Sequence, residues 1–427
     1  MPWIREHVER SIARWHGSAG QKAPAAANFS RAEQRQREAA YDQGIRAVED
    51  EVKKRPLTHA ERLAIQEKVI ASFGRFATSA LGLENDAVRM ITDEFIPVGV
   101  EFARWTRRFD PSMGKTEIVQ GCRNAWTACG LQPLLGRRTE LTPSILAYSL
   151  MYPYSDNYID RADISPRAKS AFSERFRERL RGELPAPLNE REAALWTLVG
   201  LVEGEYPRRV YPQVFESLLA IHAAQERSIA QLRNGGKCTD ADVLEITCEK
   251  GGASVLADAF LARGTLREAE AQFAFEWGFL LQLGDDLQDL RDDLLRQSAT
   301  VFTRAIRGGR SLDGLVTQLL VFSDTVAAGM DALPHTTPTL RSLLPLSWRS
   351  LIVESVADLR EFFTGGFLRG LERTHPFRMK FLRKRHVRLR RRKGMYESVF
   401  DVLVESGDQP ESVPLPDSRP VTVTLSS

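Results

Sequence analysis

Carboxylates recur at helical spacing in two separate parts of this 427-residue chain. The first pair is Asp156 and Asp160, and the second set is Asp285, Asp289 and Asp293. At roughly 100° per residue, positions four and eight apart lie on one side of a helix, so each set forms an acidic stripe. Like charges at this spacing repel one another, and hard divalent cations such as Mg²⁺, which prefer oxygen ligands, relieve that repulsion. Two stripes that face each other could hold Mg²⁺ together with a diphosphate.

A solvated helix face is the ordinary explanation of an acidic run, and it stays open for each stripe taken alone. The flanking sequence favours burial, because residues 144–154 before Asp156 and residues 273–284 before Asp285 are mostly apolar. Carboxylates that continue a buried helix need a partner. Apolar walls that end in metal-binding carboxylates suit an apolar substrate with a charged head group.

These motifs give the chain a resemblance to class I isoprenoid (terpenoid) synthases, and among them to large-terpene synthases of the tetraprenyl-β-curcumene synthase type. Residues 154–161 are similar to the first motif of that subgroup, and the spacing of the second acidic stripe is similar to its second motif. Residues 204–208 and 250–258 also resemble the subgroup, so the resemblance spans residues 95–295. The first motif lacks the denser Asp-Asp-x-x-Asp of chain-elongating prenyltransferases, which argues against simple chain elongation.

The resemblance implies an all-α fold of the class I terpenoid-synthase type, a helical bundle around a central apolar cavity. It also implies a Mg²⁺-dependent terpene synthase that ionises a long linear isoprenyl diphosphate and releases diphosphate to give a terpene hydrocarbon. Mg²⁺ would act as Lewis acid and template while the allylic C–O bond breaks. Two alternatives stay open. One is a prenyltransferase, either chain-elongating or condensing two substrates as squalene and phytoene synthases do, and the other is a non-catalytic isoprenoid-binding homologue.

The expected site residues form two groups. The aspartates of both stripes are the expected metal ligands, and all but the last are also expected to be catalytic: Asp156, Asp160, Asp285, Asp289 and Asp293. Polar and basic neighbours are expected to contact the substrate: Arg161, Lys250, Asn157 and Tyr154. For Arg161 a surface position is the alternative. The pair Gly251-Gly252 after Lys250 either breaks a helix toward the ligand or lets another helix approach closely.

Helical periodicity dominates the segments that must position these groups, and alternating strand patterns are almost absent. Apolar residues at helical spacing, from Trp3 to Trp15, predict an amphipathic N-terminal helix that packs on its own protein or docks at an interface. The expected organisation is a polar helical extension (1–75), an all-helical synthase domain (76–372), a basic amphipathic segment (373–394) and a disordered tail (395–427).

Composition limits the compartment and the partners. A net charge of +3 is too small to imply a specific nucleic-acid partner. Four cysteines without CxxC spacing favour a reducing compartment. No signal-peptide pattern and no apolar run of about 20 residues is visible, so a cytoplasmic location is expected.

Residues 373–393 contain eleven Lys or Arg and no acid, interleaved with apolar side chains such as Phe377, Phe381 and Leu382. Near an anionic membrane surface each basic side chain can contribute about 1 kcal/mol, and the apolar ones can insert at the head-group boundary. Peripheral attachment to the inner face of the membrane is therefore one expectation. A solvated basic helix, or non-specific nucleic-acid binding at low salt, is the alternative.

Overall fold

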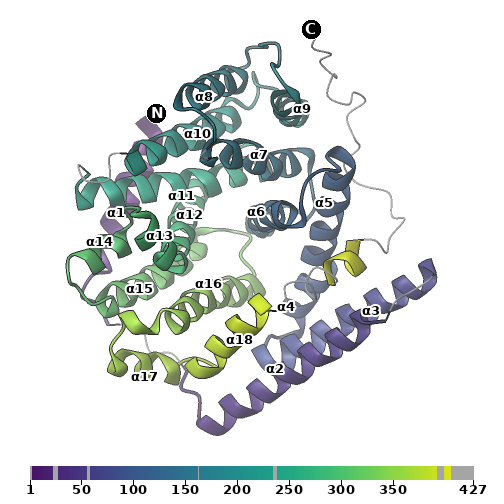
Figure 1. The fold of residues 1–427 in the computed structure, drawn as a ribbon, viewed down its shortest axis with the longest axis vertical. Helices are drawn as coiled ribbons and strands as arrows, with labels where there is room; N and C mark the ends of the chain where they lie inside the picture. Colours follow the sequence, from purple (N-terminus) through teal and green to yellow (C-terminus); the bar gives the residue numbers. More distant parts are fainter. Residues whose placement is uncertain are drawn as a thin grey trace.

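The computed structural model of the chain describes residues 2–22, 27–54, 58–161, 163–233, 238–391 and 399–404. Within these ranges the chain forms helices and connecting turns and no strand, which confirms the all-α prediction. Figure 1 shows α11 and α12 in the middle of the molecule, with the other helices arranged around them and the long α2–α3 pair along one edge. No helix in the described part of the chain is both long and apolar enough to cross a membrane.

The α-helices run in chain order as α1 (Pro2–Gly17), α2 (Arg31–Val52), α3 (His59–Phe76), α4 (Asn85–Arg89), α5 (Ile96–Phe109), α6 (Lys115–Leu134), α7 (Pro143–Asp160), α8 (Pro166–Arg181), α9 (Glu190–Glu205), α10 (Pro212–Arg233), α11 (Asp240–Arg263), α12 (Glu268–Gln288), α13 (Leu290–Arg296), α14 (Val301–Arg307), α15 (Asp313–Gly329), α16 (Pro338–Asp358), α17 (Gly365–Arg373) and α18 (Met379–Arg391). Four short helical turns accompany them: η1 (Ala77–Leu81), η2 (Met90–Phe95), η3 (Met330–Ala332) and η4 (Arg360–Phe362).

The centre of the bundle is the contact between α11 and α12, which pack along most of their lengths. Gly251 of α11 and Gly278 of α12 face each other, and a Cβ on either would overlap the backbone carbonyl of the other. A Cβ on Gly252 would overlap the ring of Phe275. Helix α11 continues without a break through the double glycine. The interpretation of this pair as a helix break is therefore wrong, and its use for close helix approach is confirmed.

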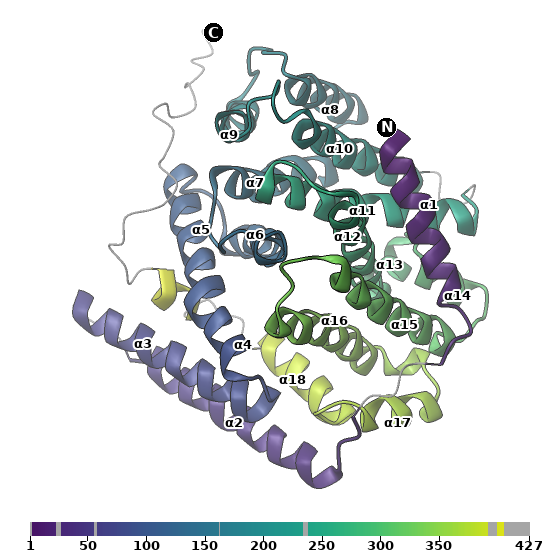
Figure 2. The same ribbon diagram turned by 180° about the vertical axis from the view of Figure 1, so that it is seen from behind.

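The N-terminal helix α1 crosses α11, α12 and α15, as Figure 2 shows from behind. Its apolar face is buried, and the ring of Trp15 lies edge-on to Phe279 and Phe322 with centroids 6.1 and 5.7 Å away. A partly buried ion pair reinforces the packing, because Arg14 donates to a carboxylate oxygen of Glu276 over 2.6 Å. The amphipathic N-terminal helix thus packs on its own protein and joins the same hydrophobic core as the bundle.

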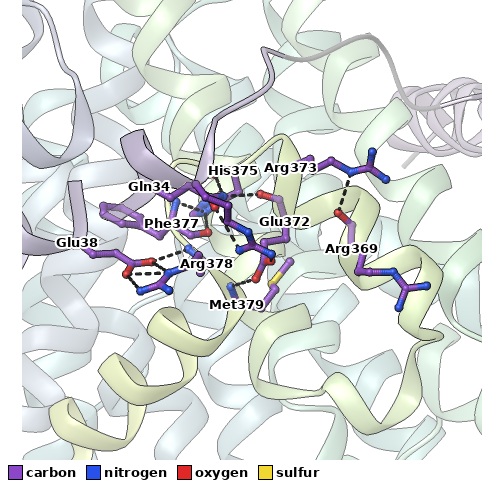
Figure 3. Close-up of polar contacts among 10 residues, drawn as sticks. Gln34, Glu38, Arg369, Glu372, Arg373, His375, Phe377, Arg378 and Met379 are labelled. Atoms are coloured by element: carbon purple, nitrogen blue, oxygen red, sulfur yellow. Dashed lines mark hydrogen bonds and ion pairs between the residues drawn. The ribbon is translucent and has the colours of Figure 1, made fainter. Parts of the chain in front are cut away.

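The start of the basic segment is fixed to α2 (Figure 3). The guanidinium of Arg378 donates from Nε to both carboxylate oxygens of Glu38, at 2.9 and 3.0 Å. The carboxamide of Gln34 donates to the carbonyl oxygens of Glu372 and His375, at 2.8 and 3.0 Å. Phe377 is also buried there, with 2% of its surface exposed.

Helix α18 then packs against α16, with Leu382 only 3% exposed. Phe377 and Leu382 are therefore buried in the protein and do not face a membrane surface, although the sequence predicts that both insert there. The cations Lys380, Arg383 and Lys384 lie on the exposed side of this segment.

The described chain ends in a helical turn, residues 399–404, which docks on α5 and α6. Asp401 accepts from Arg107 over 3.1 Å and from Lys115 over 2.6 Å, and Arg104 donates to the carbonyl oxygen of Val404. The first part of the predicted tail (395–427) therefore includes an ordered turn. Residues 405–427 lie outside the described part.

Candidate functional site

The second acidic stripe keeps its helical register across a helix junction. Helix α12 ends at Gln288, α13 starts at Leu290, and Asp289 lies between them. The N–H of Asp289 donates to the carbonyl of Asp285, and the N–H of Asp293 donates to that of Asp289, both over 2.9 Å. Since the i to i+4 bonding continues, Asp285, Asp289 and Asp293 stay on one side, as the sequence predicts.

Two of these aspartates line a solvent-open cavity of about 370 Å³ between α6, α10, α11, α12 and α16. Its charged wall residues are Arg123, Lys250, Asp285 and Asp289. Its apolar wall residues are Ile221, Val255, Leu281 and Leu351. The structure thus brings three predicted site residues, Lys250, Asp285 and Asp289, to one cavity and adds an unpredicted cation, Arg123.

The aspartates of the second stripe have raised pKa values. Burial raises the pKa of Asp285 although 47% of its side chain is exposed, Asp289 raises it further, and Arg123 and Lys250 oppose the shift. The shortest approach of Arg123 to Asp285 is 3.6 Å, between Nη2 and Oδ1. Burial also raises the pKa of Asp289 and of Asp293, with Asp292 and Asp289 respectively adding to the effect. Such carboxylates favour a cation that compensates their charge.

Asp286 points away from the stripe into the packing between α11 and α12 and is 8% exposed. It accepts from Gln282 Nε2 over 2.9 Å and from Thr247 Oγ1 over 3.4 Å. Burial raises its pKa to about 7, against the opposing effects of Gln282 and Lys250. Asp286 therefore packs and hydrogen-bonds between α11 and α12 and does not belong to the acidic stripe.

The first acidic stripe lies on α7, which packs against α6, α9 and α11. The side chains of Asp156 and Asp160 lie outside the described part of the structure, so their direction stays a prediction. Asn157 is half-buried. Among the described side chains, no three His, Cys, Asp or Glu residues converge as a metal-binding group, a statement that does not cover Asp156 and Asp160.

The remaining predicted contacts, Tyr154 and Arg161, do not line the cavity. Tyr154 is 8% exposed and donates its hydroxyl to Asp110 Oδ2 over 2.6 Å. Arg161 is half-exposed and pairs with Asp163, Nε to Oδ1 at 2.9 Å. This arrangement matches the surface alternative for Arg161.

A smaller chamber of about 40 Å³ adjoins the cavity on the side of α7 and α8. Both spaces share four wall residues: Asn124, Ile221, Gln225 and Ser254. The chamber reaches Ser155, which immediately precedes Asp156. The cavity beside the second stripe is thus adjacent to a chamber that is lined in part by the helix carrying the first stripe.

Sequence reasoning missed the contribution of α6. Four polar residues of this helix line the cavity: Gln120, Arg123, Asn124 and Thr127. They recur at helical spacing, whereas Cys122, Ala125 and Cys129 of the same helix are buried. A polar stripe at helical spacing beside buried apolar positions was the available signal.

A second cavity, of about 430 Å³, lies at the other end of α11 between α1, α14 and α15. Its one carboxylate, Asp240, is already paired with Arg304 over 2.6 Å and with Arg310 over 3.4 Å. It contains none of the predicted site residues, so the cavity beside Asp285 is the stronger candidate.

Comparison with protein-family models, with curated proteins and with solved structures finds no match for this chain.

Proposed function

We propose that the chain is a Mg²⁺-dependent class I terpene synthase with the helical bundle of that family, which ionises a long linear isoprenyl diphosphate and releases diphosphate. The supporting observation is the cavity beside Asp285, which has carboxylates and cations at one part of its wall and apolar side chains at another. An amphiphilic ligand with a diphosphate head and an apolar tail is complementary to such a wall. Pockets of about 300 Å³ or more are typical of small-molecule sites.

In this proposal the head group lies beside Arg123 and Lys250. The guanidinium of Arg123 can bind phosphate oxygens in pairs, and the ammonium of Lys250 adds a compact charge. The strained carboxylates of Asp285 and Asp289 fit a hard cation, and Asp156 and Asp160 are proposed to complete its ligands. When bound, Mg²⁺ would supply Lewis-acid stabilisation of the leaving diphosphate.

The tail of the ligand would then lie along the apolar wall toward the smaller chamber. Ile221 lines both spaces, so in this proposal it would contact the tail. The bound ligand would have to exclude water from this path to protect a carbocation from capture.

The test is incubation of the purified protein with isoprenyl diphosphates of graded length and Mg²⁺, followed by mass spectrometry of a hexane extract and a pyrophosphate assay. Hydrocarbon from one diphosphate alone supports the proposal. A requirement for two substrates supports a condensing prenyltransferase instead. Binding of the diphosphate without pyrophosphate release supports a non-catalytic homologue.

A matched pair of variants ties the activity to the cavity. Asp285→Asn should remove turnover, whereas Asp240→Asn, in the second cavity, should retain it. Loss of turnover in Asp240→Asn alone would place the chemistry in the second cavity.

Peripheral attachment to an anionic membrane stays a proposal for the basic segment. With Phe377 and Leu382 packed inside, the interaction would be electrostatic and would use the exposed Lys380, Arg383 and Lys384. Such a location on the cytoplasmic face would suit a water-insoluble substrate and product.

A further inference from the structure

Asn124 of α6 occupies the junction between the cavity and the smaller chamber, since it lines both. Its side-chain nitrogen donates twice, to Ser149 Oγ of α7 over 3.2 Å and to Asp258 Oδ1 of α11 over 3.1 Å. A carboxamide nitrogen carries two hydrogens, so these bonds use both of them.

The hydrogen-bond chain determines which way the carboxamide of Asn124 faces. Ser149 donates its only hydroxyl hydrogen to the carbonyl of Ile145 over 2.7 Å. The hydroxyl oxygen of Ser149 can therefore only accept a hydrogen bond from Asn124. The amide nitrogen of Asn124, and not its oxygen, must face Ser149. No described residue donates to the carboxamide oxygen, and that oxygen is not sealed in the core.

Asp258 is the unusual member of this cluster. Its side chain has 0% of its surface exposed, and Oδ2 has no hydrogen-bond partner among the described residues. Burial raises its pKa well above the ordinary value, which favours its neutral, protonated form. A buried acid with one unpaired oxygen is costly for stability, and among the described residues Asn124 is the side chain that donates a hydrogen bond to it.

We infer that Asp258 is a positioning residue that, together with Ser149, fixes the carboxamide of Asn124 so that its oxygen faces the reacting part of a ligand in the cavity. The inference rests on the proposed function for the identity of that ligand, an isoprenyl diphosphate. A fixed, uncharged oxygen dipole stabilises positive charge that develops on the allylic carbon. Being neutral, it attracts a carbocation without offering the carboxylate that would capture it as an ester.

The kinetic test uses variants of similar volume. Asp258→Leu removes the acceptor, and Asn124→Leu removes the carboxamide. Each should lower kcat by about 10-fold or more with KM nearly unchanged, because the interaction forms as charge develops. The double variant should be no slower than Asn124→Leu, since Asp258 acts through Asn124. Independent, multiplying losses in the double variant would overturn the inference.

Rescue separates positioning from packing. Asp258→Asn keeps an uncharged acceptor of the same shape, so it should recover most of the kcat lost in Asp258→Leu. A kcat in Asp258→Asn as low as in Asp258→Leu would contradict the assignment. Thermal unfolding of all variants identifies any that lose activity because they do not fold. Only the variants that fold are then compared by kcat.

A readout without turnover keeps this inference distinct from the proposed function. In protein labelled with ¹⁵N only at asparagine, the two side-chain amide hydrogens of Asn124 should exchange slowly with solvent. They should exchange faster in Asp258→Leu and remain slow in Asp258→Asn. Rapid exchange in the parent protein refutes the fixed carboxamide even if the enzyme is active. Slow exchange with no turnover on any diphosphate would refute the proposed function and the role assigned to Asn124 in it, while the hydrogen-bond arrangement would stand.

Discussion

Gly251 and Gly278 bring the backbones of α11 and α12 into direct contact beside the candidate site, and both residues line the cavity. Lys250 and Asp285 extend from the same two helices into that cavity. The distance between a proposed substrate contact and a proposed metal ligand therefore depends on two residues that have no side chain.

Gly278→Ala should force α11 and α12 apart. Overpacking of this kind costs roughly 1–3 kcal/mol, and it should also lower activity because the cavity wall changes shape. Urea unfolding gives the stability change. The matched control is Gly200→Ala in α9, where a Cβ meets nothing within 4 Å and the better helix propensity of alanine should stabilise the protein slightly. Equal effects of the two substitutions would show that the helix contact is not tight.

Asp289→Ala should reduce turnover by about 100-fold or more without destabilising the ligand-free protein. The raised pKa of Asp289 means that its ionised form is disfavoured in the folded state. Its contribution to stability is therefore present at low pH and is lost as the pH rises through the folded-state pKa. Removing the carboxyl should flatten that part of the pH–stability curve, which thermal unfolding across the acidic range measures. Asp156→Ala should show the same loss of turnover if the first stripe shares the metal.

Arg123→Gln should weaken binding of the diphosphate. A hydrogen bond to a charged group contributes about 1.5–3 kcal/mol, so an increase in KM of roughly 10-fold or more is expected. Arg161→Gln is the comparison, because Arg161 lies outside the cavity and already pairs with Asp163. Steady-state kinetics measures KM for both variants. A larger increase in Arg161→Gln than in Arg123→Gln would indicate that the diphosphate binds at the end of α7.

The pH dependence of stability should carry a contribution from His375. Burial lowers its pKa to about 4, and the ring accepts a hydrogen bond from the N–H of Phe377 over 3.2 Å. As the pH falls below about 6.5, the unfolded chain binds a proton that the folded chain excludes, so stability decreases until the pH reaches about 4. His375→Gln should reduce this slope, and an unchanged slope in that variant would contradict the assignment to His375. Unfolding curves between pH 7 and pH 4 provide the measurement.

Replacement of Lys380, Arg383 and Lys384 by glutamine should reduce binding to anionic vesicles. At about 1 kcal/mol for each charge, the affinity should fall by roughly 3 kcal/mol, or about 100-fold. Liposome flotation at physiological salt measures it. This test is cleaner than deletion of the segment, because deletion would also remove the buried Phe377 and Leu382. Unchanged flotation of the triple variant would reject an electrostatic membrane role for α18.

Local features of the sequence were sufficient to predict the helices and the second acidic stripe. Helix periodicity and caps are local properties, and Thr142, Ser165 and Asn189 each accept a hydrogen bond from the backbone N–H three residues on. The register of Asp285 and Asp289 is also local, since it depends only on 3.6 residues per turn.

Packing between segments far apart in the chain decided which side chains pair with each other and which line the cavity. The run of charges beginning at Arg373 looked free in the sequence, yet Arg378 is paired with Glu38 of α2. Arg123 and Asn124 belong to a polar stripe of α6 that does not by itself indicate a ligand site, and they join one only where α6 packs against α11. The sequence by itself determined which residues share a helix face. Only the tertiary structure decided which faces meet, because that depends on side-chain volumes and glycine contacts between segments far apart in the chain.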